Sequence, residues 1–185
     1  MSAIITERLI IRRPNESDLT DFLNYRNDAE NLRFQPLRQI DAATALNNLK
    51  KQVTINEEQA TGWIMFAIEL KNEKKMIGEV GVYISSADQT SGDIGWAVHK
   101  DYHKNGYALE GAKVLLAYVF GLRRLERVTA TSIGNNTASL LLMKRLGMQR
   151  VKDHSQNQFI DGVSYEEHLY SISRAEWHSI TAEKK

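Results

Sequence analysis

The sequence contains no cysteine, only two prolines, and no long apolar run. The lack of cysteine excludes disulfides, thiolate metal sites and a cysteine nucleophile, and it fits a reducing compartment, so we expect a cytoplasmic protein. The five histidines show no metal-ligand spacing, so we expect no metal. Met1–Arg13 lacks the apolar segment of a signal peptide, and no transmembrane segment is predicted.

Net charge is nearly absent as well, at +1 at pH 7. A chain without a general basic field is not expected to bind nucleic acid or a membrane surface. Its 185 residues are enough for one domain with a sizeable core. We therefore predict a single domain over residues 1–180 and a frayed tail at Thr181–Lys185.

Hydrophobic periodicity predicts an alternation of strands and helices. Helices are expected after the cap candidates Asn15 or Ser17, Asp41, Gly106, and Asn136 or Thr137, with Gly147 ending the last of them. Hairpins before a crossover indicate an α/β (α+β) fold with a mixed sheet of about seven strands flanked by helices. The strands are expected at Ile4–Arg12, Trp63–Leu70, Lys75–Ile84, Ile94–Val98, Arg127–Ile133, Met148–Val151 and Glu167–Ile172.

The stretch Asp93–Leu122 is the most informative part of the chain. An apolar run, Ile94–Val98, is followed by the polar segment His99–Asn105 and then by Gly106, which opens a helix-like apolar pattern. A helix start presents unpaired N–H groups and the positive end of the macrodipole, so it binds phosphate well. A glycine there lets a ligand approach the backbone.

The segment His103–Ala108 resembles motif A of the GNAT acetyltransferases, written Q/R-x-x-G-x-G/A. His103 stands where Gln or Arg is usual, and Lys104 where many relatives carry glycine. Further matches make nearly the whole chain similar to the RimJ/RimL-like ribosomal-protein N-acetyltransferases, and this resemblance implies the GNAT acyl-CoA N-acyltransferase fold. These matches are Thr6–Ile10 with Arg12, Ile77-Gly78, Asn136 and Ser139 with Leu146–Met148, and Asp161-Gly162 with Tyr165 and Tyr170.

The resemblance implies a binding site for acetyl-CoA as cosubstrate. The pyrophosphate would lie on the loop formed by His103, Lys104, Asn105, Gly106, Tyr107 and Ala108. The backbones of Trp96, Ala97 and Val98 would face the pantetheine chain, with Asn136 and Ser139 at its amide. For Trp96 and Val98 a plain core role is the alternative, and for Asn136 it is a helix cap.

The resemblance also suggests catalytic residues. Ser139 is a candidate donor to the leaving sulfur. Many relatives carry a tyrosine acid at the position of Met143, and methionine cannot donate a proton. Asp93 or Glu79 could act as a base through water, although either carboxylate could instead pair with a basic side chain. The acceptor site is expected to have Phe34, Trp63 and Tyr165 in its walls.

The leading hypothesis is an N-acetyltransferase that transfers acetyl from acetyl-CoA to a primary amine by direct attack in a ternary complex. A protein N-terminal α-amine, with a pKa of about 7.7–8.0, depends less on a base than lysine, near 10.4. A small-molecule amine, such as a polyamine or an aminoglycoside-like compound, is one alternative acceptor. A CoA-binding sensor or partner-binding module without catalysis is another interpretation. Both a monomer and a homodimer remain open.

Overall fold

The computed structural model describes residues 3–56 and 61–182. These residues form one nine-stranded sheet in the order β1-β2-β3-β4-β5-β6-β9-β7, with β8 paired to β9. All neighbours are antiparallel except β5 and β6, so the sheet is mixed, as predicted. The strands are β1 (Ile4–Ile5), β2 (Leu9–Arg12), β3 (Gly62–Leu70), β4 (Lys75–Ile84), β5 (Ser91–Val98), β6 (Arg127–Ile133), β7 (Gln149–Arg150), β8 (Gln156–Ile160) and β9 (Val163–Ser173).

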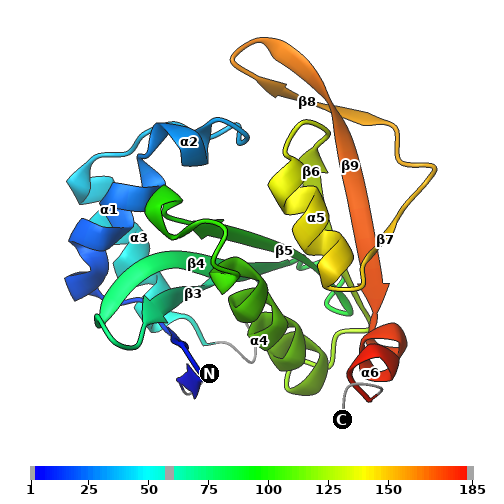
Figure 1. Ribbon diagram of the computed structural model, residues 1–185, viewed down its shortest axis with the longest axis horizontal. Coiled ribbons are helices and arrows are strands. Elements are labelled where there is room, and N and C mark those ends of the chain that lie inside the picture. The colour runs from blue at the N-terminus through cyan, green and yellow to red at the C-terminus, as the bar shows by residue number, and fades with distance from the viewer. Residues whose placement is uncertain (1–2, 57–60, 183–185) are drawn as a thin grey trace.

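The helices cover both faces of this sheet. Figure 1 shows the three N-terminal helices grouped at one side of the molecule and the long β9 at the other, with α4 and α5 between them. The helices are α1 (Leu19–Arg26), α2 (Ala29–Leu32), α3 (Ala42–Thr54), α4 (Tyr107–Gly121), α5 (Thr137–Arg145) and α6 (Arg174–Ala182), with 3₁₀ turns at Glu16–Asp18 and Lys100–Tyr102. None of the described helices is long and apolar enough to cross a membrane.

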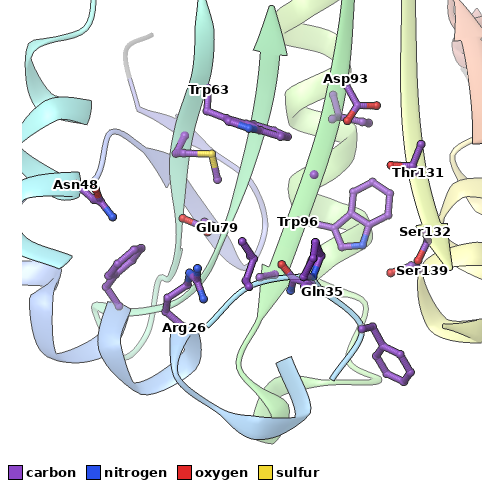
Figure 2. Close-up of a pocket in the computed structure, with 18 of the residues that line it drawn as sticks. Arg26, Gln35, Asn48, Trp63, Glu79, Asp93, Trp96, Thr131, Ser132 and Ser139 are labelled. Carbon is purple, nitrogen blue, oxygen red and sulfur yellow. The ribbon is translucent and has the colours of Figure 1, made fainter. Parts of the chain in front are cut away.

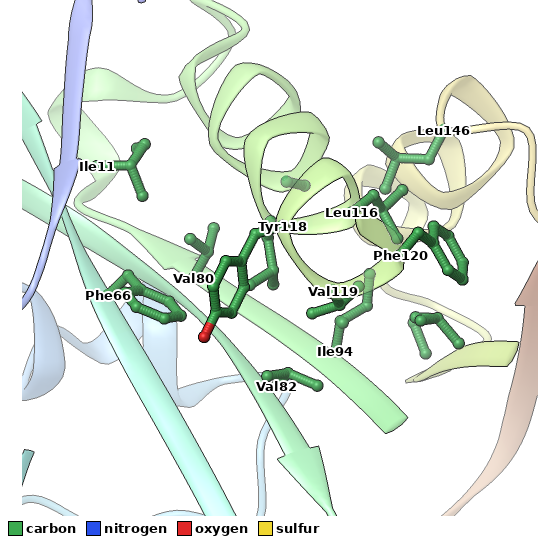
Figure 3. Close-up of a cluster of buried hydrophobic side chains, with 14 of the residues drawn as sticks. Ile11, Phe66, Val80, Val82, Ile94, Leu116, Tyr118, Val119, Phe120 and Leu146 are labelled. Atoms are coloured by element: carbon green, nitrogen blue, oxygen red, sulfur yellow. The ribbon is translucent and has the colours of Figure 1, made fainter. Parts of the chain in front are cut away.

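The larger core lies between the sheet and α4. Leu116, Tyr118 and Val119 of α4 are buried against alternate residues of the central strands, including Val80 and Ile94 (Figure 3). Burying each such side chain stabilises the fold by about 1.5–3 kcal/mol. A smaller core on the opposite face joins α1 and α3 to the sheet through Phe22, Tyr25, Ala45, Leu49, Ala67 and Met76. Both faces are therefore anchored, and strand positions alternate between them.

Three terminal features differ from the sequence prediction. The first predicted strand is two strands, because Thr6 turns the chain and hydrogen-bonds Leu9 through both its N–H and its hydroxyl. The strand β8 was missed because its start is polar. The Asp161-Gly162 pair joins β8 to β9 in a turn with two positive φ angles. The last helix, α6, was also missed: it includes Thr181 and Ala182 of the predicted tail, and 183–185 lie outside the described residues.

A splay between β5 and β6 prepares the functional site. The two strands pair in parallel only from Ser91–Asp93 to Arg127–Thr129. Beyond these three positions β5 continues along β4, whereas β6 diverges towards β9. A gap lined by unpaired backbone therefore opens in the middle of the sheet.

Candidate active site

Two cavities meet at this gap. One, of about 610 Å³, lies on the side of α1–α3 and reaches Glu79, Asp93 and Trp63. The other, of about 430 Å³, extends to the start of α4. Six residues line both: Phe34, Gln35, Trp96, Ala97, Asn136 and Ser139. The arrangement allows two ligands to approach one point from opposite sides of the sheet.

The backbone of β5 faces the gap at alternate residues. Ala97 lies opposite Glu79, and the N–H of His99 donates to Ile77 O at 2.7 Å, so odd-numbered positions bond to β4. By the alternation of an antiparallel ladder, the backbone groups of Trp96 and Val98 are directed the other way, into the gap. A ring nitrogen of His103, Nε2, is hydrogen-bonded to the carbonyl oxygen of Val98 at 2.7 Å. Within the described residues, no strand pairs with β5 on this side beyond Asp93, so the N–H groups of Trp96 and Val98 can serve a ligand.

The loop before α4 has the geometry of an anion site. Gly106 is the N-cap in a left-handed conformation, φ 82°, without a side-chain cap. The first N–H groups of the helix, including those of Tyr107 and Ala108, have no partner within it. A Cβ on Gly106 would meet only Arg8 Nη2, at 3.6 Å. Glycine is thus favoured here by its backbone angle more than by lack of space.

Arg8 holds this loop from the N-terminal hairpin. Its guanidinium donates to Glu110 Oε2 at 2.6 and 2.8 Å and to the Asn105 carbonyl at 2.9 Å, and it lies 4.6 Å from the centre of the Tyr107 ring. Burial acts to raise the pKa of Glu110, but hydrogen bonds from Thr6 and Arg8 outweigh it and hold the pKa below its ordinary value. Glu110 therefore has a structural role: it holds Arg8 and Thr6 against the start of α4.

The predicted loop residues divide into two groups. Lys104, Gly106, Tyr107 and Ala108 line the cavity, as does His103, whose ring also closes the end of β5. Asn105 is not among the lining residues, and its side-chain amide donates to the carbonyls of Tyr102 and His103. The structure adds Arg145, at the end of α5, which lines the same cavity. No sequence motif marked this arginine, because only the packing of α5 beside the loop brings it there.

The start of α5 carries the two polar residues that the sequence singled out. Asn136 caps the helix by accepting from the N–H of Ser139 at 3.2 Å, and both residues line both cavities. The cap and a binding role are thus compatible. Met143 is fully buried in the core, so this side chain does not reach the gap.

Glu79 lines the larger cavity, on the strand beside the one that carries Trp96 (Figure 2). It is opposite Ala97, and therefore level with the residues that line the gap. Burial raises its pKa above the ordinary value, while the hydroxyl of Tyr25 and the guanidinium of Arg26 act in the opposite direction. A half-buried carboxylate with a raised pKa is suited to proton transfer near neutral pH.

Asp93 lies farther along the same cavity. It is four positions from Ala97 on β5, which corresponds to about 13 Å along the strand. Burial raises its pKa from 3.8 to about 6, against the effect of a 2.8 Å hydrogen bond donated by Thr129 Oγ1. The two carboxylates that the sequence could not separate thus occupy different parts of the cavity.

The predicted acceptor walls are brought together only in part. Phe34 and Trp63 line the larger cavity, whereas Tyr165 lies on the β8–β9 hairpin and is not among the residues that line either cavity. Arg26 and Gln35 line the larger cavity without having been predicted. Within residues 3–56 and 61–182, no group of three or more His, Asp or Glu side chains is arranged to hold a metal ion.

Comparisons with known proteins agree with this geometry. The acetyltransferase (GNAT) domain family matches residues 8–149. YnaD, an N-acetyltransferase of Bacillus subtilis strain 168 that is itself uncharacterised, is 28% identical over 95% of this chain and 99% of its own length. YoaA, a second such protein of the same strain, is 24% identical over 90% of this chain and 94% of its own length.

Solved structures show the same fold. The ribosomal-protein-S5-alanine acetyltransferase of Vibrio fischeri superposes with a TM-score of 0.83 at 22% identity, over 96% of this chain and 99% of its own. RimL, a ribosomal α-N-protein acetyltransferase solved with coenzyme A, has a TM-score of 0.79 at 14% identity, over 92% and 96%. With the family match over most of the chain, the chain belongs to the GNAT family and is an acetyl-CoA-dependent N-acetyltransferase.

Proposed function

We propose that this enzyme acetylates the α-amine of a protein N-terminus by direct attack on acetyl-CoA in a ternary complex. The observation that carries the proposal is the meeting of two cavities at the β5–β6 splay, with Ser139 and Trp96 in both. One cavity suits the cosubstrate and the other the acceptor. No covalent intermediate on the protein is needed when both substrates reach the same point.

The smaller cavity fits acetyl-CoA. The N-terminal N–H groups of α4, together with Lys104 and Arg145, are suited to bind the phosphates. The backbone N–H groups of Trp96 and Val98 suit the pantetheine chain and the thioester oxygen. A donor positioned on a developing oxyanion commonly contributes about 3 kcal/mol. When bound, acetyl-CoA supplies the thioester carbonyl that the amine attacks.

We assign the general base to Glu79. It is level with Ala97 at the gap, whereas Asp93 is about 13 Å away along the strand. Glu79 would take the proton of the attacking amine through a water molecule. An α-amine is partly neutral at pH 7, so one carboxylate of raised pKa is sufficient help. Ser139, on the opposite side of the gap, is the proposed donor to the departing thiolate.

The choice of a protein α-amine is supported by the fold it shares with two ribosomal-protein acetyltransferases. The cavity, at about 610 Å³, is large enough for one or two N-terminal residues but also for a small amine. Acetyl-CoA dependence is consistent with the cytoplasmic location expected from the sequence. A non-catalytic sensor would have no need of a carboxylate at Glu79, opposite Ala97, which lines both cavities.

The test is mass-spectrometric detection of CoA-dependent acetylation. Peptides with a free N-terminus are compared with N-formylated peptides that contain lysine, and with small amines. We expect acetylation of the free α-amines, and a loss of kcat in Glu79→Gln with unchanged acetyl-CoA binding. Glu126→Gln is the matched control, because this exposed glutamate lines neither cavity. Binding of acetyl-CoA without turnover of any amine would contradict the proposal and support the sensor.

A further inference from the structure

We propose that the acceptor carries a second cationic group, which binds between Asp93 and the indole of Trp63, at the end of the acceptor cavity away from Glu79. The inference rests on the proposed function, since it concerns the amine that this enzyme acetylates. It assigns to Asp93 substrate recognition in place of proton transfer. The ligand class is an amine with two separated positive charges.

The strand register gathers the residues of this subsite in one row. Trp63 lies opposite Tyr83, Tyr83 opposite Asp93, and Asp93 opposite Thr129. Residues directly opposite each other project from the same face of a sheet. Four consecutive strands, β3 to β6, thus present two aromatic rings, a carboxylate and a hydroxyl side by side.

Trp63 forms a platform for a cation. Its side chain extends over Gly95, where an added Cβ would lie 3.5 Å from the indole Cη2 atom. The indole is 44% exposed, and its centroid is 5.7 Å from the ring of Tyr83. Figure 2 shows it spread across the strands towards Asp93. An ammonium or guanidinium over an accessible indole face gains about 0.5–2 kcal/mol.

Asp93 is half-buried and lacks the cation that a carboxylate withdrawn from water normally has. In the described part of the chain its one hydrogen-bond partner is the hydroxyl of Thr129, and no ion pair involves it. Buried charges are usually paired, as Asp18 is with Arg12 in this protein. Burial and the nearby Glu167 raise the pKa of Asp93 to about 6. A ligand cation would remove this penalty.

The two ends of the larger cavity differ in charge. Arg26 lies beside Glu79, so the Glu79 end of the cavity already holds a cation and is not suited to a second one. The Asp93 end combines negative charge with aromatic surface. A bound dication would therefore be oriented, with one amine at the gap and the other group at Asp93.

The spacing selects the class of acceptor. Glu79 and Asp93 are separated by about 13 Å along the strand direction. An α-amine and the side-chain cation of a lysine or arginine in the first three residues span this distance, since an extended chain advances about 3.3–3.6 Å per residue. The two ends of a linear triamine span it as well. Both sources share the same chemistry.

The experiment compares matched acceptors in wild type, Asp93→Asn and Trp63→Leu. The first pair is two peptides with a free N-terminus, one with lysine and one with norleucine at positions two and three. The second pair is a linear triamine and a monoamine of equal length. We expect wild type to have a KM about tenfold lower for the dication of at least one pair, with similar kcat. Both variants should lose this preference and retain their KM for the acceptor that carries a single charge. The pair that shows the preference identifies the source of the cation.

Two outcomes would overturn the inference. One is equal KM for dication and monocation in wild type. The other is an equal loss for both acceptors in Asp93→Asn, which would indicate a role in catalysis. Acetylation of α-amines without a dication preference leaves the proposed function intact, whereas no acetylation of any acceptor overturns both. Circular dichroism and thermal unfolding of each variant exclude misfolding as the cause of a lost preference.

Discussion

Replacing Asp93 with asparagine should make the unliganded protein more stable at neutral pH. The pKa of this carboxyl rises from 3.8 to about 6 on folding, mainly because burial penalises the charged form. The folded state therefore binds the proton more tightly than the unfolded state. Stability is greatest when the carboxyl is protonated in both states, below pH 3.8, and falls as the pH rises through 6. Asparagine has the shape of the protonated form and keeps Oδ1 as the acceptor for Thr129.

The magnitude follows from the pKa change. At about 1.36 kcal/mol for each pH unit, the rise from 3.8 to about 6 corresponds to about 3 kcal/mol above pH 7. Roughly half of this cost is already present at pH 5, because the unfolded carboxyl is ionised there while most of the folded carboxyl is not. Asp93→Asn should thus exceed wild type by about 3 kcal/mol at pH 7.5, and by about half as much at pH 5.

The assay is urea unfolding of both proteins at the two pH values, without acetyl-CoA or acceptor. Asp88→Asn is the opposite control, because hydrogen bonds from Ser91 and Thr90 lower the pKa of Asp88 to about 2. That carboxylate is stabilising above pH 3.8, so its replacement should destabilise the protein at both pH values. An Asp93→Asn protein no more stable than wild type, or an advantage independent of pH, would refute the reasoning about Asp93.

Three further predictions concern the cosubstrate site. Gly106→Ala forces a side chain into the left-handed region at a cost of about 1–2 kcal/mol; urea unfolding should show this loss, and binding calorimetry a weaker affinity for CoA. Arg8→Ala removes the donors to Glu110 and to the Asn105 carbonyl, so CoA affinity should fall several-fold, and less in Arg8→Lys. Equal CoA affinities in wild type and both variants would rule out a role for this contact. Ser139→Ala should lower kcat more than it raises the KM for acetyl-CoA, and steady-state kinetics with equal changes in both would mean that the hydroxyl only positions the cosubstrate.

Local signals in the sequence predicted most of the fold. The bounds of β6 agree with the predicted strand, Asp41 and Asn136 cap the helices that they were expected to cap, and Gly106 has the positive φ of a left-handed residue. Each of these features depends on a few adjacent residues. The strand β8 was missed for the converse reason: its polar start, Gln156–Gln158, is held extended by pairing with β9 and not by its own preference.

The site was predictable where it depends on one segment and not where it depends on several. The loop at Gly106 was identified because strand, loop and helix are contiguous. Arg145 and Arg26 were not, since each reaches a cavity through the packing of a helix that belongs to another part of the chain. The contact of Arg8 with Glu110 joins residues 102 positions apart, and neither residue indicates the other in the sequence.

The two carboxylates show why register decides function here. In the sequence, Glu79 and Asp93 are equivalent candidates for a base, because each lies on a strand next to the other. Antiparallel pairing places Glu79 opposite Ala97 and Asp93 opposite Tyr83, which separates them by four positions. The splay of β6 begins beyond Asp93, so only Glu79 is level with the gap. One carboxylate is then placed to take a proton. The other, half-buried without a cation at a cost in stability, is placed to bind a cation that arrives with the substrate.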